Sequence, residues 1–249
     1  MEPFNSQKDT LFHRAEAVGA FQFDRSVAAV FPDMISRSVP GYHTILTGIG
    51  ELSARYAQPG TRLYDLGCSL GAAALTMRRA LPQDCGCEIV AVDNSPAMLA
   101  RAQEYIEAWR SSIPIQLRCE DVLDTQIDNA SMVVMNFTLQ FIDPAQREGV
   151  LSKIFTGLRP GGLLILSEKI HFDDPTLQEA VEHLHLQFKR ANGYSELEIS
   201  QKRAALENVL ITDTLQTHLQ RLKQVGFTHV GPWFQAYNFV SLSAFKAPA

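Results

Sequence analysis

The residues best placed to do chemistry lie at positions 63–71, where a short strand-like run carries Asp65 and leads into Gly67 and Gly71. Glycine lacks a Cβ and readily adopts positive φ, so a turn built on it lets backbone amides approach a ligand closely. A helical run follows, and an apolar, mostly β-branched run at 89–92 then leads to Asp93. A carboxylate at the end of that second strand can bind both hydroxyls of a ribose. This order predicts a nucleoside site; the plainer alternative is an ordinary strand-to-helix connection.

The type of nucleoside follows from what the turn contains. The chain has no Gly-Lys-Ser/Thr sequence of a P-loop, and the acid at Asp65 is unfavourable beside a pyrophosphate. A carboxylate there suits a cationic group, such as the amino group and sulfonium of S-adenosyl-L-methionine. The spacing acid-x-Gly-x-x-x-Gly resembles the first motif of the class I methyltransferases, and that resemblance supplies the name of the cofactor.

Alternating elements must position this turn. The patterns predict strands at 63–66, 88–92, 114–118, 131–136 and 162–167, and helices at 71–81, 95–110 and 144–158. Such alternation is typical of a mostly parallel sheet with flanking helices, here a Rossmann-like class I methyltransferase fold. Ser95-Pro96 predicts a helix start, the Arg-Pro-Gly-Gly run at 159–162 predicts a break between helix and strand, and residues 225–227 and 234–245 predict two closing antiparallel strands.

At 249 residues with 46% hydrophobic content, the chain suits a single domain spanning 1–249. Residues 1–55 precede the core fold, and their mixed apolar pattern predicts short helices that cap the pocket. Residues 173–212 are long, polar and helical in pattern where a minimal methyltransferase has a short connection. We expect this segment to be a helical insertion with a function of its own.

Polar and small residues follow each predicted parallel strand, where open α/β sheets bind their ligands. Asp121 is expected to accept a hydrogen bond from an adenine amino group, Val122 to offer a backbone amide, and Asn136 to reach the methionine end. The plainer alternatives are a helix cap for Asp121 and a turn at the strand end for Asn136. The full set of candidate cofactor contacts from these strand ends is Asp65, Gly67, Cys68, Ser69, Asp93, Asn94, Asp121, Val122 and Asn136.

A second group of charges lies in the insertion. Asn192-Gly193 predicts the end of one helix, and Ser195 with Glu198 predicts a capping box at the start of the next. Gln201, Lys202 and Arg203 then fall about two turns into that helix. These charges form either a solvated helix face or an anion clamp, since arginine offers a rigid fork to a carboxylate.

Composition narrows the class of protein. The net charge is −5, from 22 basic and 27 acidic residues, and no long basic run predicts a nucleic-acid groove. No apolar run is long enough to span a bilayer and the start has no signal-peptide pattern, so we expect a cytoplasmic protein without membrane contact. Cys85 and Cys87 are expected to be reduced loop thiols. His183 and His185 cannot share a helical face, so no metal site is expected.

Longer strings allow a narrower statement. Residues 30–35 (VFPDMI), 37–42 (RSVPGY), 64–71 (YDLGCSLG), 136–141 (NFTLQF) and the run 188–203 together resemble the carboxy-S-adenosyl-L-methionine synthase family, in order from about Asp9 to the C-terminus. The resemblance implies a methyltransferase-like enzyme that transfers no methyl group. It implies conversion of S-adenosyl-L-methionine and prephenate to carboxy-S-adenosyl-L-methionine and phenylpyruvate, a product that serves a partner enzyme, a tRNA carboxymethyltransferase acting on the wobble uridine. A homodimer is implied as well.

The same resemblance assigns roles by position. It adds Tyr42 and Arg203 to the cofactor contacts and makes them the residues expected to act in catalysis, with Arg203 pairing the added carboxylate. The product is expected to co-purify, and no direct contact with nucleic acid is expected. Two alternatives stay open: an S-adenosylmethionine-dependent methyltransferase, and a non-catalytic regulator that binds the cofactor.

Overall fold

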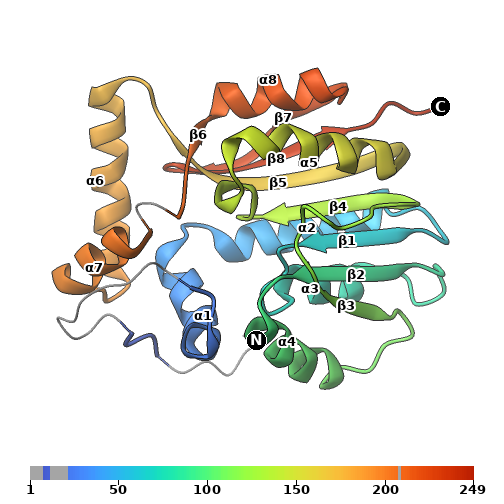
Figure 1. The fold of residues 1–249 in the computed structure, drawn as a ribbon, viewed down its shortest axis with the longest axis horizontal. Helices are drawn as coiled ribbons and strands as arrows, with labels where there is room; N and C mark the ends of the chain where they lie inside the picture. The colour runs from blue at the N-terminus through green and yellow to red at the C-terminus, as the bar shows by residue number, and fades with distance from the viewer. Residues whose placement is uncertain (1–7, 12–21, 207–208) are drawn as a thin grey trace.

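The computed structural model describes residues 8–11, 22–206 and 209–249, and its centre is an eight-stranded sheet (Figure 1). Along the sheet the strand order is β3-β2-β1-β4-β5-β8-β7, and β6 pairs with β5 off this path. The strands are β1 (Arg62–Leu66), β2 (Glu88–Asp93), β3 (Ile115–Cys119), β4 (Ala130–Asn136), β5 (Leu158–His171), β6 (Asp213–Thr214), β7 (His229–Ala236) and β8 (Phe239–Phe245).

Strands β1 to β5 pair in parallel, and β8 runs antiparallel to both β5 and β7. Continuous apolar runs such as Met132–Met135 in β4 are fully buried, as parallel strands covered on both faces require. The predicted fold class is thereby confirmed, and the chain closes with two antiparallel strands as predicted, although their bounds differ from the predicted 225–227 and 234–245.

Helices cover both faces of the sheet. One face carries α2 (Tyr42–Tyr56), α3 (Ala72–Ala80) and α4 (Pro96–Glu107); the other carries α5 (Pro144–Gly157) and α8 (Leu215–Val225), which contact one another. Ser95 caps α4 as predicted, accepting a hydrogen bond from the Met98 amide. The helix stops at Glu107, three residues before the expected end, where Ala108 begins the cap.

Four helices gather near the ends of β1 and β4 that carry the candidate site (Figure 1). They are α1 (Arg25–Ser38) and α2 from the N-terminal segment, and α6 (Pro175–Ala191) and α7 (Glu196–Leu206) from the insertion. The two N-terminal helices have 14 and 15 residues and so are longer than the short helices expected. Residues 1–7 and 12–21, which belong to the predicted cap, lie outside the described residues.

Two predictions in the second half of the chain were wrong. Residues 159–162 do not separate helix from strand but lie inside β5, where the register shifts: Ala130 pairs with Leu158, yet Met132 pairs with Leu163. The glycines are accommodated in that irregularity, with Gly161 at a φ of 75°. Residues 225–227 end α8 rather than form a strand, because the sequence there continues a helix that Thr214 caps.

Among the described helices, none is both long enough and apolar enough to cross a membrane.

Candidate active site

The glycine turn after β1 is held in a fixed shape. The amides of Gly67 and Cys68 both donate to the Val92 carbonyl at 2.8 Å, and Gly67 has a φ of 76°. A Cβ on Gly67 would lie 2.4 Å from the side chain of Thr138. Glycine is therefore required at this position for two reasons: its φ is positive, and the segment after β4 packs directly against it.

Asp65 connects this turn to its neighbours. Its Oδ2 accepts a hydrogen bond from the Ala74 amide at 2.9 Å, which anchors the start of α3. Burial raises its pKa to about 7, the Ala74 bond opposes that rise, and the nearby charge of Asp93 adds to it. Burial, and next the charge of Asp65, also raises the pKa of Tyr42. Tyr42, at the start of α2, lies in the same buried cluster as Cys68 of the turn, which brings together two predicted site residues.

Asp93, at the end of β2, holds the other side of the turn. One carboxylate oxygen accepts from the Ser69 amide at 2.8 Å and the other from the Ser95 amide at 2.9 Å. Burial raises the pKa of this carboxyl group, and the two amide bonds oppose that rise. Each oxygen retains a further lone pair, so the carboxylate can still accept from ribose hydroxyls.

Asn136, at the end of β4, has a buried side-chain Oδ1 with no hydrogen-bond partner among the described residues. Such an atom costs roughly 1–3 kcal/mol when it stays unpaired, so it points to a polar ligand. The next residue, Phe137, has a φ of 65° while its amide donates to the Ser167 carbonyl at 2.8 Å. The chain thus turns sharply at the place where the methionine end is expected, and this observation fits the cofactor.

The remaining candidates differ in exposure. Cys68 is buried, and burial raises the pKa of its thiol, which stays protonated and serves to pack the turn. Asn94 and Asp121 are exposed and Val122 is half-buried. Asp121 Oδ1 accepts a hydrogen bond from the Leu123 amide at 2.8 Å and so forms an Asx turn. This arrangement is close to the helix cap that was the plainer alternative for Asp121. The other carboxylate oxygen of Asp121 can still accept a hydrogen bond, so the contact with the adenine amino group stays a prediction.

An aromatic wall, formed by Phe137, Phe239 and His185, extends from the end of β4 to α6 of the insertion. The ring of Phe137 meets that of Phe239 at a centroid distance of 5.9 Å, and Phe239 meets the His185 ring at 4.9 Å. His185 Nε2 lies 2.9 Å from the Ser38 carbonyl. Burial, followed by the charge of Lys189, lowers the pKa of His185 to about 3, so the ring is neutral and structural, as expected. No group of potential metal ligands occurs within the described ranges.

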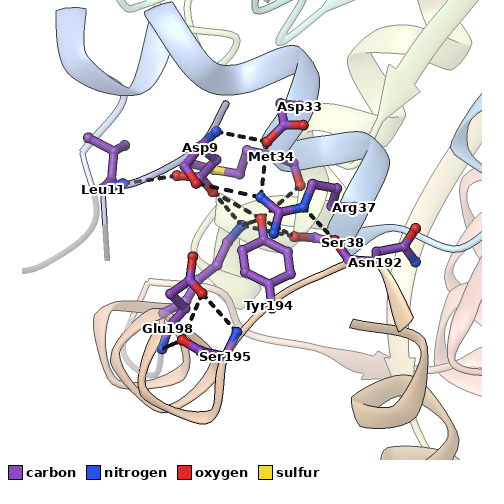
Figure 2. Close-up of polar contacts among 11 residues, drawn as sticks. Asp9, Leu11, Asp33, Met34, Arg37, Ser38, Asn192, Tyr194, Ser195 and Glu198 are labelled. Carbon is purple, nitrogen blue, oxygen red and sulfur yellow. Dashed lines mark hydrogen bonds and ion pairs between the residues drawn. The ribbon is translucent and has the colours of Figure 1, made fainter. Parts of the chain in front are cut away.

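The predicted capping box of α7 is confirmed (Figure 2). The Glu198 amide donates to Ser195 Oγ at 3.3 Å, while Glu198 Oε2 accepts from the Ser195 amide at 2.7 Å. The box fixes the start of α7 and hence the direction in which its later residues point. Lys202 turns inward and is buried, whereas the Arg203 side chain is 70% exposed.

Asp9, Ser38 and Tyr194 form a buried polar cluster from three segments (Figure 2), and Lys202 of α7 contacts all three residues. The Lys202 ammonium donates to Ser38 Oγ at 2.9 Å and to the Tyr194 hydroxyl at 3.2 Å, and it lies 3.9 Å from Asp9 Oδ2. The Tyr194 hydroxyl in turn donates to Asp9 Oδ2 at 2.9 Å. The charge of Lys202 is thus already paired, which removes it from the predicted anion clamp and leaves Arg203.

Replacing Tyr194 by phenylalanine should lower the free energy of unfolding by about 1–3 kcal/mol, because Lys202 and Asp9 then lose a buried hydrogen-bond partner. Urea unfolding measures this change. Tyr237→Phe serves as the control, since that tyrosine is exposed. Equal stability of the two variants would contradict a structural role for the cluster.

Arg203 acts electrostatically on two lysine side chains, an arrangement that the sequence did not reveal. Its guanidinium is 3.7 Å from Glu182 Oε2 on α6, and its charge acts on Lys169 of β5 and Lys189 of α6. Lys169 lies two residues beyond the predicted strand 162–167, and Lys189 lies in the run 188–203, so both lysines stood near segments that the sequence had singled out. Neither gave a motif, because their proximity depends on how α6 folds back over the sheet.

Comparisons with known proteins agree with this arrangement. The model of a methyltransferase domain family matches residues 63–162. Carboxy-S-adenosyl-L-methionine synthase of Hydrogenovibrio crunogenus is 67% identical over 241 residues, covering 96% of this chain and 95% of that protein. The protein of the same name from Shewanella oneidensis is 56% identical over 243 residues, 97% and 100% of the two chains. An O-methyltransferase family protein from Burkholderia thailandensis shares the fold, with a TM-score of 0.66, 17% identity, and coverage of 96% and 67%.

Proposed function

Because the chain belongs to the carboxy-S-adenosyl-L-methionine synthase family, and so is a transferase enzyme, we propose that it converts S-adenosyl-L-methionine and prephenate to carboxy-S-adenosyl-L-methionine and phenylpyruvate. The supporting observation is a cationic side chain beside the expected methionine end of the pocket. The charge of Arg203 on α7 lowers the pKa of Lys169, and Lys169 lies two residues beyond Ser167, the partner of Asn136 in β5. A simple methyl transfer has no need of that charge.

The residues suit the nucleoside in separate ways. The Gly67 turn and Asp93 would hold its ribose, the unpaired Asn136 Oδ1 would accept from its amino group, and Tyr42 would close the pocket from α2. Arg203 would pair the carboxylate of the product. Its contact with Glu182 is 3.7 Å long and exposed, so little has to be broken for a closer, two-pronged pair to form.

The proposed reaction balances without a further reactant. The prephenate dianion loses carbon dioxide and hydroxide as its ring becomes aromatic, leaving the phenylpyruvate anion. Hydroxide takes a proton from the S-methyl group, forming water, and the carbanion so formed bonds to the carbon dioxide. The protein would position the partners and exclude water, which would otherwise protonate the carbanion. Helices α1, α2, α6 and α7 lie at this end of the sheet (Figure 1) and would provide that exclusion.

An isotope experiment tests the reaction. Prephenate labelled with ¹³C in its ring carboxylate, mixed with S-adenosyl-L-methionine and the protein, should yield labelled carboxy-S-adenosyl-L-methionine together with phenylpyruvate. An S-adenosylmethionine-dependent methyltransferase would leave prephenate intact and form S-adenosylhomocysteine once an acceptor is supplied. A non-catalytic regulator would bind the nucleoside and consume nothing. Either of these two results would overturn the proposal.

We further propose that the product supplies the carboxymethyl group for a tRNA wobble-uridine modification, carried out in the cytoplasm by a separate carboxymethyltransferase. Deleting the gene should then remove the carboxymethyl-derived wobble nucleoside from cellular tRNA, and its persistence would contradict this role.

We propose a homodimer as well. Leu177 and Leu184 on α6 and Leu197 on α7 expose apolar surface that a second copy can cover. Sedimentation as a monomer would contradict that assembly.

A further inference from the structure

Two partly buried lysines next to Arg203 have no role in the scheme above. Lys169 lies near the end of β5, opposite Phe239 of β8 in the sheet register. Lys189 lies on α6 on the same helical face as Glu182 and His185, which precede it by seven and four residues. Because His185 packs on Phe239, the two lysines approach the same aromatic wall from the sheet and from the helix.

These ammonium groups lack close partners. Among the residues that the structure describes, no acceptor forms a hydrogen bond with Nζ of Lys169 or of Lys189, and no carboxylate forms an ion pair with either. Glu182 is the acid that acts on Lys169, and the same carboxylate also faces Arg203 and accepts from Gln178 Nε2 at 2.6 Å. Among the described residues, Glu182 is thus the carboxylate that acts on Lys169 and Arg203, and no acid acts on Lys189, so the cluster has two positive charges in excess.

Burial and mutual repulsion both act on the lysines of this cluster. Burial and, next, the charges of Lys169 and Arg203 together lower the pKa of Lys189 to about 8. Burial also lowers the pKa of Lys169; Glu182 opposes this change and Arg203 adds to it. Holding like charges together in a partly dry site is unfavourable unless an anion compensates them. The nearby Lys202 differs, because Asp9, Ser38 and Tyr194 surround its ammonium.

The cluster lies on the same face of the sheet as Asn136. Asn136 is the sheet partner of Ser167, and Lys169 follows Ser167 by two residues, so both side chains of β5 lie on one face. Phe137 and Phe239 bridge from that position to His185 on α6. A ligand held by the two lysines would therefore lie next to the methionine end of the nucleoside, where the second reactant has to lie.

We propose that Lys169 and Lys189 form a binding site for the carboxylates of the dianionic co-substrate, while Arg203 serves the carboxylate that is transferred to the nucleoside. This inference rests on the proposed function, since it assigns a place to prephenate. Two carboxylates match the two excess charges, and a lysine offers each a mobile point charge. Because the two lysines would hold prephenate, Arg203 could pair with the transferred carboxyl group both before and after it bonds to the nucleoside.

Isothermal titration calorimetry tests the site without turnover. Prephenate is titrated into protein saturated with S-adenosylhomocysteine, which lacks the reacting methyl group. Lys169→Met and Lys189→Met should each raise the dissociation constant of prephenate about tenfold, in line with the loss of one charged partner. Lys223→Met, at an exposed lysine of α8, removes the same charge elsewhere and should leave it unchanged. Thermal unfolding should show no loss of stability in the first two variants, because a like-charge contact is removed.

The outcomes separate this inference from the function itself. If the unaltered protein neither binds nor consumes prephenate, the proposed function fails. If it consumes prephenate while both lysine variants bind that compound as the control does, the function stands and this inference is overturned. A loss of affinity for carboxy-S-adenosyl-L-methionine as large as that for prephenate would likewise overturn it, because the lysines would then belong to the nucleoside site.

Discussion

Asp93→Ala should weaken the binding of S-adenosyl-L-methionine about a hundredfold or more. The substitution removes the carboxylate expected to accept from the ribose, and it also releases the amides of Ser69 and Ser95 that this carboxylate holds at 2.8 and 2.9 Å. Loss of one member of a buried, hydrogen-bonded charged set costs about 2–5 kcal/mol in binding. Equilibrium dialysis with radiolabelled S-adenosyl-L-methionine measures the change.

A matched variant separates binding from folding in that experiment. Asp124→Ala removes an exposed acid that follows β3 and gives the same change in net charge. It should bind the nucleoside as the unaltered protein does. Circular dichroism should show both variants folded at the temperature of the assay. Affinity of Asp93→Ala within about threefold of the control would exclude Asp93 from the site, because no charged hydrogen bond is worth so little.

Arg203→Ala should raise the dissociation constant of carboxy-S-adenosyl-L-methionine about thirtyfold, while that of S-adenosyl-L-methionine changes little. The two ligands differ by one carboxylate, and a hydrogen bond to a charged group contributes about 1.5–3 kcal/mol. Since the Arg203 side chain is 70% exposed and forms only a 3.7 Å contact with Glu182, its removal should not disturb the fold. Isothermal titration calorimetry with each nucleoside gives the two dissociation constants and hence their ratio.

Arg190→Ala provides the control for the arginine experiment. Arg190 also lies in the insertion and also pairs with an exposed glutamate, Glu196, at 2.5 Å. Its removal should alter neither affinity. Equal losses for both nucleosides in Arg203→Ala would contradict the carboxylate role, since they would show that Arg203 binds a part that the two ligands share.

Much of the fold was predictable because its signals are local. The strand at 63–66, the glycine turn and the cap at Ser95 depend on residues within one turn or strand, and the structure has them as β1, the Gly67 turn and the start of α4. The capping box of Ser195 and Glu198 was predictable for the same reason. The site residues that follow consecutive strands could be found because parallel strands end at one edge of the sheet.

The parts that were missed depend on tertiary contacts. Helix α8 is amphipathic in sequence, with Leu215, Leu219 and Leu222 at helical spacing, so the helix itself was predictable and only its contact with α5 was not. The irregularity at 159–162 depends on the register between β4 and β5. Lys202 and Arg203 looked equivalent in the sequence, yet one is buried against Asp9 and the other faces solvent. The meeting of Lys169 with Lys189 likewise requires the path of α6, which no local pattern records.

The mass of the nucleoside released from the protein tests the central claim most directly. The protein is denatured once as purified and once after incubation with S-adenosyl-L-methionine and prephenate, and the released nucleosides are weighed by mass spectrometry. The proposed function predicts that both samples release a species heavier than S-adenosyl-L-methionine by one carbon dioxide. Release of only S-adenosyl-L-methionine or S-adenosylhomocysteine from both samples would contradict it and would favour an ordinary methyltransferase.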